Sequence, residues 1–161
     1  MFNLKAEFYL KIIFLFSFIA LISAFFIEYI LGHQPCNLCL IERIPYGLSI
    51  MIIMAIFLIR KNQKFLVMLL ILTFIFSFAI SFYHFGIEQG FFQESSVCGV
   101  KSSTEIVTKE DLLKQLSEKT ISCKDVTFRI FGLSLTSINI IISLLLILTL
   151  TKIFANYEKK R

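Results

Sequence analysis

Four long apolar runs constrain the fold of this chain more than any other feature of its sequence. A helix needs about 20 mostly apolar residues to cross the hydrocarbon core of a bilayer. Runs of about that length lie at residues 12–31, 38–59, 65–83 and 130–150. We therefore expect an all-α membrane protein that forms a bundle of four transmembrane helices. Residues 1–161 are expected to be a single membrane domain, with loops 32–43 and 84–129 at one end of the bundle.

The composition agrees with a lipid environment. Only 17% of the residues are charged and 57% are hydrophobic, whereas about 25% of the residues of a soluble domain are charged. This balance excludes a disordered chain. The formal charge of +5 does not indicate a nucleic-acid partner, because the basic residues fall at the ends of the apolar runs. Basic residues at those places set the orientation of membrane helices.

Two of the runs carry features that qualify the prediction. Glu42 and Arg43 lie near the start of the second run, and Pro45 removes a backbone donor, so we expect a kink there. Lys5 and Lys11 precede the first run as they would precede the core of a signal peptide. The core of a signal peptide has about 7 to 15 residues, so this run is too long for one, and no A-x-A cleavage site follows it. We therefore expect a retained helix.

The lysines and arginines predict which way the helices point. Those that flank the runs in short segments are Lys5, Lys11, Arg60, Lys61, Lys64, Lys152, Lys159, Lys160 and Arg161. Such residues stay in the cytoplasm, so both termini are expected there. The four cysteines, Cys36, Cys39, Cys98 and Cys123, then lie on the opposite side. That side of a bacterial inner membrane is oxidising, so these thiols are expected to be paired or to cycle between redox states.

The sharpest local motif is a C-x-x-C pair, Cys36 and Cys39, preceded by Pro35. Proline suits the first helical position, so both cysteines are expected in the first turn of a helix. Unpaired N–H groups and the helix dipole stabilise a thiolate there. Arg43 follows Cys39 by four residues, so on a continuous helix it shares a face with that sulfur and can hold a thiolate or an anionic electron acceptor. Pairing of Arg43 with Glu42 or with lipid headgroups fits the same spacing.

The four cysteines could instead form a metal site or two structural disulfides. A four-cysteine zinc site usually has two C-x-x-C pairs, but Cys98 and Cys123 lie far more than two residues apart. We therefore expect no metal. Two structural disulfides are the stronger alternative, because such crosslinks are common in extracytoplasmic loops. A C-x-x-C disulfide constrains little of the unfolded chain, however, and is more often a redox switch.

Other polar residues give less specific signals. Residues 104–119 predict a short amphipathic helix that either lies on the membrane surface or docks a soluble partner. His84, at the end of the third run, is either a solvated interfacial residue or a hydrogen-bond donor to a cofactor carbonyl. Asn139, within the fourth run, is expected to hydrogen-bond between helices. Glu28, near the end of the first run, is expected to reach water.

Taken together, these residues resemble the disulfide-bond formation protein B (DsbB) family, the quinone-linked oxidants of bacterial inner membranes. The resemblance rests on four spans and on the segments Cys36-Asn-Leu-Cys39, Glu42-Arg43, Cys98-Gly99, Cys123 and Phe131-Gly-Leu-Ser-Leu135. It extends over nearly the whole chain.

The resemblance implies two redox-active disulfides. Cys36–Cys39 would lie beside a membrane quinone, ubiquinone or menaquinone. Cys98–Cys123 would exchange with a periplasmic thioredoxin-fold oxidant that is DsbA-like. In the family order, the partner attacks Cys98, the freed Cys123 attacks Cys36 of the inner disulfide, and Cys39 donates to the quinone. The protein would then be an inner-membrane, quinone-dependent thiol oxidoreductase that supports disulfide bond formation.

The resemblance also implies that Arg43 and His84 lie near the quinone. The chain departs from the family in having Phe128 where many members have a tryptophan before the last span, and in lacking prolines before Cys98. Both departures concern the choice of partner. In a related class, the vitamin K epoxide reductase type, the loop cysteines precede the C-x-x-C pair, whereas here they follow it. A non-enzymatic membrane scaffold with two structural disulfides is the alternative of a different class, and it would neither bind nor reduce a quinone.

Overall fold

The structure of the protein is a computed structural model that describes residues 4–59, 62–93, 98, 122–124, 129–130 and 132–158. Its helices are α1 (Leu4–Tyr29), α2 (Asn37–Ile41), α3 (Ile44–Leu58), α4 (Gln63–Glu88) and α6 (Leu135–Glu158). Strands β1 (Arg129–Ile130) and β2 (Leu133–Ser134) form a short antiparallel ladder. The predicted helix at residues 104–119 lies outside the described residues.

Four segments are long and apolar enough to cross a membrane. They are Ala6–Tyr29, Asn37–Leu58, Gln63–Glu88 and Leu135–Asn156. Large apolar side chains cover much of the outside of these helices, as expected where lipid takes the place of water. The prediction of an all-α, four-span membrane bundle is therefore confirmed.

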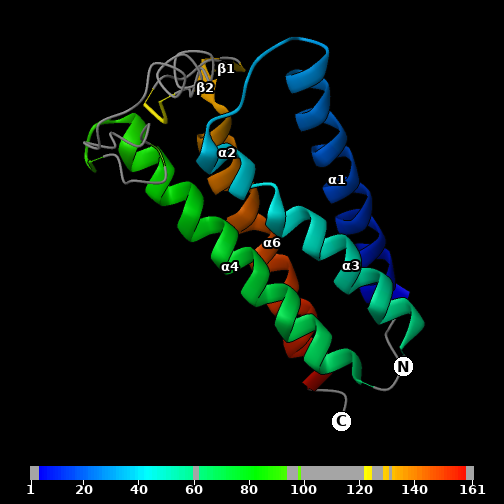
Figure 1. Ribbon diagram of the computed structural model, residues 1–161. Coiled ribbons are helices and arrows are strands. Elements are labelled where there is room, and N and C mark those ends of the chain that lie inside the picture. Colours follow the sequence, from blue (N-terminus) through cyan, green and yellow to red (C-terminus); the bar gives the residue numbers. More distant parts are fainter. Residues whose placement is uncertain are drawn as a thin grey trace, which may run out of the picture.

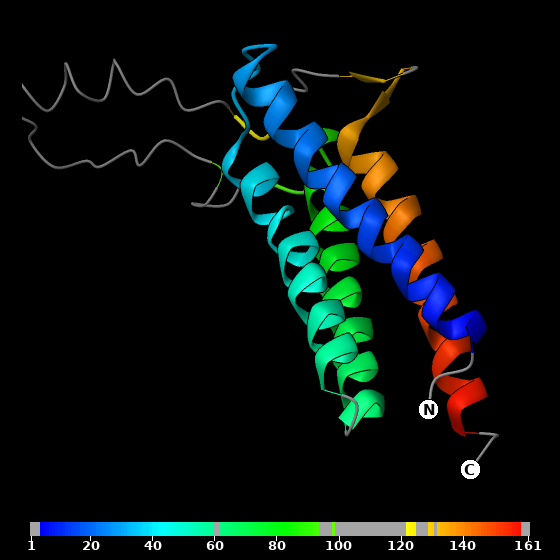
Figure 2. The same cartoon turned by 90° about the vertical axis from the view of Figure 1, so that its right-hand side faces the viewer.

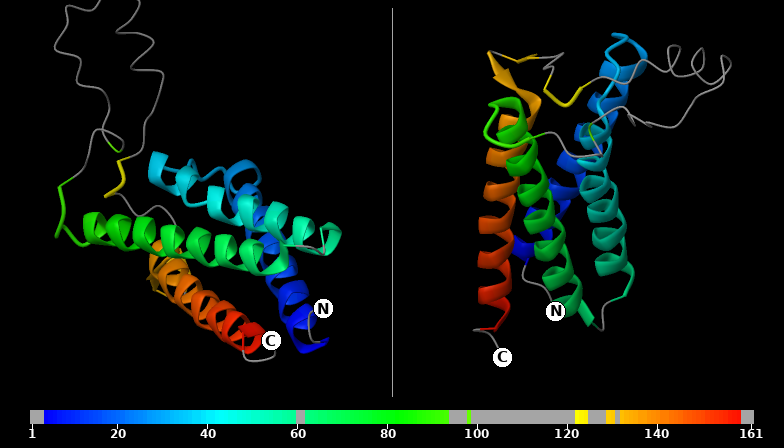
Figure 3. Two further views of the ribbon diagram at one scale, coloured as in Figure 1. Left: turned by 90° about the horizontal axis from the view of Figure 1, so that it is seen from below. Right: turned by 60° about the vertical axis from the view of Figure 1, so that its left-hand side comes forward.

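The spans pack as neighbours in a bundle. Helix α3 contacts both α1 and α4, and α4 packs along α6, so that α4 lies between α3 and α6 in both views of Figure 3. The start of α1 and the end of α6 lie at one end of the bundle, as Figure 1 shows. Helix α2 and the β ladder lie at the opposite end, which is also clear in Figure 2. We call this the cysteine end.

The core of the bundle is apolar and includes a few small hydroxyl side chains. Its buried residues include Leu10, Ile13, Ile53, Ile56, Leu70, Phe74 and Leu150, contributed by all four spans. Ser49 donates a hydrogen bond to Ser17 at 2.9 Å, and Ser143 donates one to Ser77 at 3.2 Å. Small hydroxyl residues let membrane helices approach closely and bond to one another. These contacts join α1 to α3 and α4 to α6.

The second span is broken near its start. Helix α2 ends at Ile41 with Glu42 as its C-cap, and α3 begins at Ile44 with Arg43 as its N-cap. Pro45 lies in the first turn of α3, where the missing N–H removes no helical hydrogen bond. The predicted kink is therefore present, and it falls at the Glu42–Arg43 junction.

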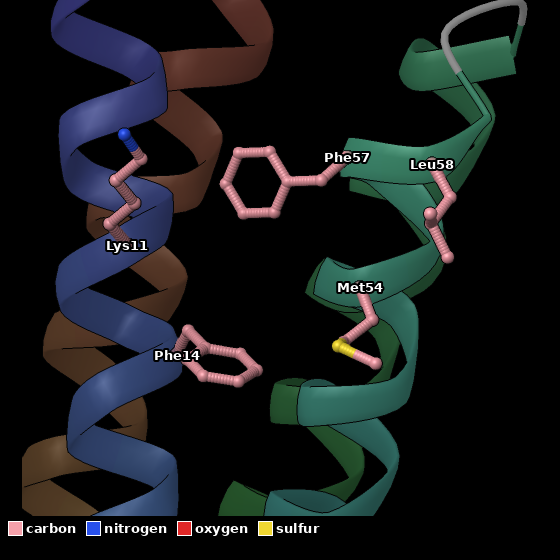
Figure 4. A pocket seen from close by; sticks show the side chains of 5 residues that line it. All are labelled: Lys11, Phe14, Met54, Phe57 and Leu58. Atoms are coloured by element: carbon pink, nitrogen blue, oxygen red, sulfur yellow. The ribbon is translucent and has the colours of Figure 1, made fainter.

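A cavity of about 250 Å³ lies between α1 and α3, near the end that carries the chain termini. Figure 4 shows its lining, which consists of Lys11, Phe14, Met54, Phe57 and Leu58. Several of these side chains are exposed on the outside of α3, so the cavity opens to the side of the bundle. It lies far along the bundle from the cysteines and takes no part in the site described next.

Candidate functional site

The start of α2 presents the C-x-x-C pair. Cys36 is the N-cap, and its Sγ accepts a hydrogen bond from the backbone N–H of Cys39 at 3.3 Å. The two sulfur atoms lie 2.6 Å apart, well inside ordinary contact. The prediction that Pro35 opens this helix is wrong, because Cys36 itself caps it and the helix begins at Asn37. As a result the Cys36 sulfur is held at the helix terminus by a backbone hydrogen bond.

His84 brings an imidazole ring to this sulfur from α4. Its Nε2 lies 3.6 Å from Cys36 Sγ, and its Nδ1 lies 2.9 Å from Glu42 Oε1. His84 is only 2% exposed. A carboxylate on one ring nitrogen fixes the orientation of the other, so Glu42 aims Nε2 of His84 at the sulfur pair.

These contacts change the acidity of Cys36, which lies just outside the second span. The hydrogen bond with the Cys39 thiol lowers the pKa of Cys36, and the contact with His84 lowers it further. Burial acts in the opposite direction, and the resulting pKa is about 4. When the pair is reduced, Cys36 is therefore a thiolate at neutral pH. The sequence predicted a lowered pKa for the pair without saying which thiol carries it.

The polar contacts continue from Glu42 into the bundle. Asn139 on α6 donates to Glu42 Oε2 at 3.2 Å and to Ser81 Oγ at 2.7 Å. Tyr46 on α3 donates its hydroxyl to Asn139 Oδ1. The prediction that Asn139 hydrogen-bonds between helices is confirmed. Because α3, α4 and α6 all contribute, the packing of the bundle fixes the position of Glu42.

A second buried carboxylate approaches His84 on the same helix. Glu88 Oε1 lies 3.9 Å from His84 Nε2 and accepts a hydrogen bond from Thr136 Oγ1 at 2.7 Å. The side chain of Glu88 is 6% exposed, yet its Oε2 has no hydrogen-bond partner among the residues that the structure describes. Leaving a buried acceptor unpaired is unfavourable, so this oxygen has capacity for a further donor or cation.

Arg43 has its partners on α1. Its guanidinium donates to Glu28 and lies 5.3 Å from the centre of the Phe25 ring. The expectation that Arg43 shares a face with Cys39 assumed one continuous helix, whereas α2 ends at Ile41 and α3 begins at Ile44. Glu28, predicted to reach water, is partly exposed and is also the ion-pair partner of Arg43, whereas the sequence had suggested Glu42 for that role. A role for Arg43 at the quinone stays a prediction.

Cys98 and Cys123 form a disulfide with their Cα atoms 5.4 Å apart. Both are buried, and they pack with Cys36 in one apolar cluster. The buried members of this cysteine cluster are Cys36, Leu38, Ile87, Cys98 and Cys123, and Cys39, Ile41 and Tyr83 flank it. The fold thus brings the two cysteine pairs together at one end of the bundle.

Three residues of this site were not recognised from the sequence as part of it. Glu42 was noted only as a neighbour of Arg43, while Glu88 and Thr136 were not considered as partners of His84. An ionisable residue within a membrane span is by default a candidate functional residue. That rule points to Glu42 and Glu88, which both lie within candidate spans. No comparable signal marks Thr136.

Comparison with known proteins gives a consistent result. Residues 6–153 match the model of the family described as disulfide bond formation protein DsbB. A protein of Rickettsia prowazekii (strain Madrid E), with the name Uncharacterized protein RP370, is 32% identical over 136 residues, which are 83% of this chain and 79% of that relative. The chain therefore belongs to the DsbB family and is a multi-pass membrane protein of disulfide bond formation.

Proposed function

We propose that this protein passes electrons from a periplasmic thioredoxin-fold dithiol, a DsbA-like partner, through its two cysteine pairs to a membrane quinone. The observation that carries the proposal is the cysteine cluster, which packs the Cys98–Cys123 disulfide with Cys36. Disulfides move between proteins and within them by attack of a thiolate on a neighbouring disulfide sulfur. Such an exchange requires the two pairs to be adjacent, and two independent structural crosslinks do not.

The orientation is part of this proposal. A single membrane domain over residues 1–161 would lie in the bacterial inner membrane with both termini in the cytoplasm and the cysteine end in the periplasm. The distribution of basic residues supports this orientation. The arrangement of the bundle supports it too, because the start of α1 and the end of α6 lie together, at the end opposite α2, whose N-cap is Cys36.

The thiol exchange begins at the outer pair, and the role of each sulfur follows the family resemblance. A thiolate of the partner attacks Cys98, and Cys123 leaves as a thiolate. Cys123 then attacks Cys36 of the oxidised inner pair, and Cys39 leaves as a thiolate. The second thiol of the partner then attacks the mixed disulfide, which oxidises the partner and releases Cys98 as a thiolate. Cys98 attacks Cys123 in its bond to Cys36, so that the Cys98–Cys123 disulfide forms again and Cys36 is released. The inner pair is then a dithiol.

Oxidation of that dithiol needs an acceptor of two electrons and two protons. A bound quinone would be such an acceptor. Arg43 fits the task of holding a quinone, because its guanidinium offers several N–H donors to a carbonyl oxygen. Its neighbours Leu40 and Ile44 are exposed apolar side chains, a surface that a lipid-soluble ring can reach from the bilayer. His84, oriented by Glu42, can stabilise the Cys36 thiolate until the inner disulfide forms again.

The test uses the full-length protein in liposomes that contain ubiquinone or menaquinone. A reduced thioredoxin-fold dithiol oxidant is added, quinone reduction is followed by absorbance, and the redox state of both proteins is read on non-reducing gels. We expect one quinol for each partner disulfide formed. If neither quinone is reduced although the partner and the bundle are intact, the scaffold alternative holds and the proposal fails.

A further inference from the structure

We propose that the reduced Cys36–Cys39 pair and His84 form a binding site for Zn²⁺ and similar thiophilic divalent ions, a site that is lost when the pair is oxidised. One ligand atom from each residue lies within 4.8 Å of the other two. Two thiolates and an imidazole make up a known zinc ligand set, with a fourth position left for water or another ligand. This site uses one cysteine pair and a histidine, unlike the four-cysteine set that the sequence disfavours.

The distances fit the geometry of such a site with one small adjustment. Around a tetrahedral zinc ion, a thiolate sulfur and an imidazole nitrogen lie about 3.6 Å apart. Cys36 Sγ and His84 Nε2 are 3.6 Å apart. Two thiolate sulfurs on zinc lie about 3.8 Å apart, so Cys39 Sγ must move outward from its present 2.6 Å. Cys39 is only half-buried, which leaves it room to rotate and gives the ion a route to the site.

Glu42 supplies the support that metal-bound histidines usually have. Its Oε1 lies 2.9 Å from His84 Nδ1, which holds the ring with Nε2 directed at the sulfurs, so that an entering ion can replace the proton between Nε2 and Cys36. Most zinc-binding histidines have a carboxylate or carbonyl on the second ring nitrogen, and this partner strengthens metal binding. Asn139 in turn holds the other oxygen of Glu42 at 3.2 Å.

The charges around the site also favour a cation. Two thiolates neutralise a divalent ion, so the ion with its protein ligands carries no net charge in a poorly solvated place. Glu88 adds a buried carboxylate 3.9 Å from His84 Nε2, and its Oε2 has no hydrogen-bond partner among the described residues. A metal-bound water, or the ion itself after a side-chain rotation, would give this oxygen a partner.

Binding would be controlled by the redox state of the pair. The ion replaces the thiol protons, no electron is transferred, and the bound thiolates are held apart as ligands. A disulfide offers no thiolate, so the oxidised pair does not bind. Zinc would therefore hold the inner pair in its reduced form and inhibit its reoxidation, whatever the electron acceptor is.

The experiment titrates Cd²⁺ into the full-length protein with Cys98→Ser and Cys123→Ser, reduced and then freed of reductant, in detergent micelles. Cadmium is chosen because its bonds to thiolates absorb in the ultraviolet. We expect one ion per chain, displacement by Zn²⁺, and no absorbance after oxidation of Cys36–Cys39. The wild-type chain, reduced only at the inner pair, should bind one ion in the same way.

Histidine variants give the decisive comparison. His84→Asn, whose amide can still bond to Glu42 but offers no ring nitrogen, should weaken binding at least about 10-fold, as should Glu42→Gln. His33→Ala, which removes the other histidine of the chain, should bind like the parent. Equal affinity in the His84→Asn and parent proteins, or binding that survives Cys36→Ser, would overturn the inference. Quinone is absent from this experiment, so a protein that binds cadmium but never reduces quinone would contradict only the proposed function.

Discussion

The two cysteine pairs lie in one cluster but differ in what surrounds their sulfur atoms. Cys36 contacts the imidazole of His84, which Glu42 orients, whereas Cys98 and Cys123 pack in the cluster with Leu38 and Ile87. Nearby ionisable groups control how readily a thiol becomes a nucleophile. The inner pair therefore has its own activating group, the imidazole of His84. The outer pair is a disulfide in the structure, and a thiolate from outside the pair opens it.

The largest expected effect comes from breaking the inner pair alone. Cys39→Ser should reduce the rate of quinone reduction to background, because no inner disulfide can form again. The outer pair should still exchange with the partner, since its disulfide is intact. Quinone absorbance and non-reducing gels measure the two activities side by side. Quinone reduction at the normal rate in this variant would end the proposed relay.

Breaking the outer pair at Cys123 should give a different failure. Cys123→Ser leaves Cys98 without its resolving thiol, so a mixed disulfide with an oxidised or activated thioredoxin-fold partner should accumulate. Non-reducing gels would reveal it as a band that reductant removes. Cys98→Ser is the matched control and should trap nothing through that position. The variants should stay folded, because helix packing and lipid burial stabilise the bundle.

The activation of Cys36 can be measured through the pH dependence of its alkylation rate. In the reduced, metal-free protein the pKa of Cys36 is lowered to about 4, so Cys36 remains a thiolate well below neutral pH. Its alkylation rate should therefore change little between about pH 8 and about pH 6, while thiols of the denatured chain, with a pKa of about 8.5, should slow roughly 80-fold. Mass spectrometry of the alkylated peptides gives both rates. A parallel decline for Cys36 would contradict the lowered pKa.

Arg43 should affect the inner pair only. Arg43→Gln removes the charge beside the proposed quinone site and should weaken quinone use about tenfold, the size expected for loss of one charged hydrogen bond. Partner exchange at Cys98–Cys123 should be unchanged. Glu28→Gln is a useful companion, because it removes the ion-pair partner and keeps the guanidinium. Loss of partner oxidation with unchanged quinone affinity would show that Arg43 acts elsewhere.

The smallest effect tests the packing around the cluster. A Cβ at Gly86 would lie 2.1 Å from the Phe92 ring, whereas a Cβ at Gly47 meets nothing within 4 Å. Phe92 stacks on Tyr83, which flanks the cysteine cluster. Gly86→Ala should therefore destabilise the protein by about 1–3 kcal/mol, and Gly47→Ala, the matched control in another helix, should not. Thermal unfolding in detergent compares them, and equal stability would mean that Phe92 moves aside easily.

The sequence by itself determined the number of spans, the helix break near Pro45 and the membership of the family. These features depend on local patterns: an apolar run long enough for a bilayer, a proline that cannot donate, and a cysteine motif with fixed spacing. The boundaries of the spans follow from the same patterns only roughly. The fourth run, expected at 130–150, is observed as the span Leu135–Asn156, because β1 and β2 occupy the start of the predicted run.

Only the tertiary structure decided which side chains meet the sulfurs. His84 lies 48 residues from Cys36, and its contact depends on how α4 is rotated and packed against the start of α2. Arg43, at the junction of α2 and α3, pairs with Glu28 because α1 packs beside this junction. Membrane helices are apolar on nearly every face, so hydrophobic periodicity does not mark the side that packs inward. Packing and the pairing of a few polar side chains decide that rotation, and both depend on all the helices at once.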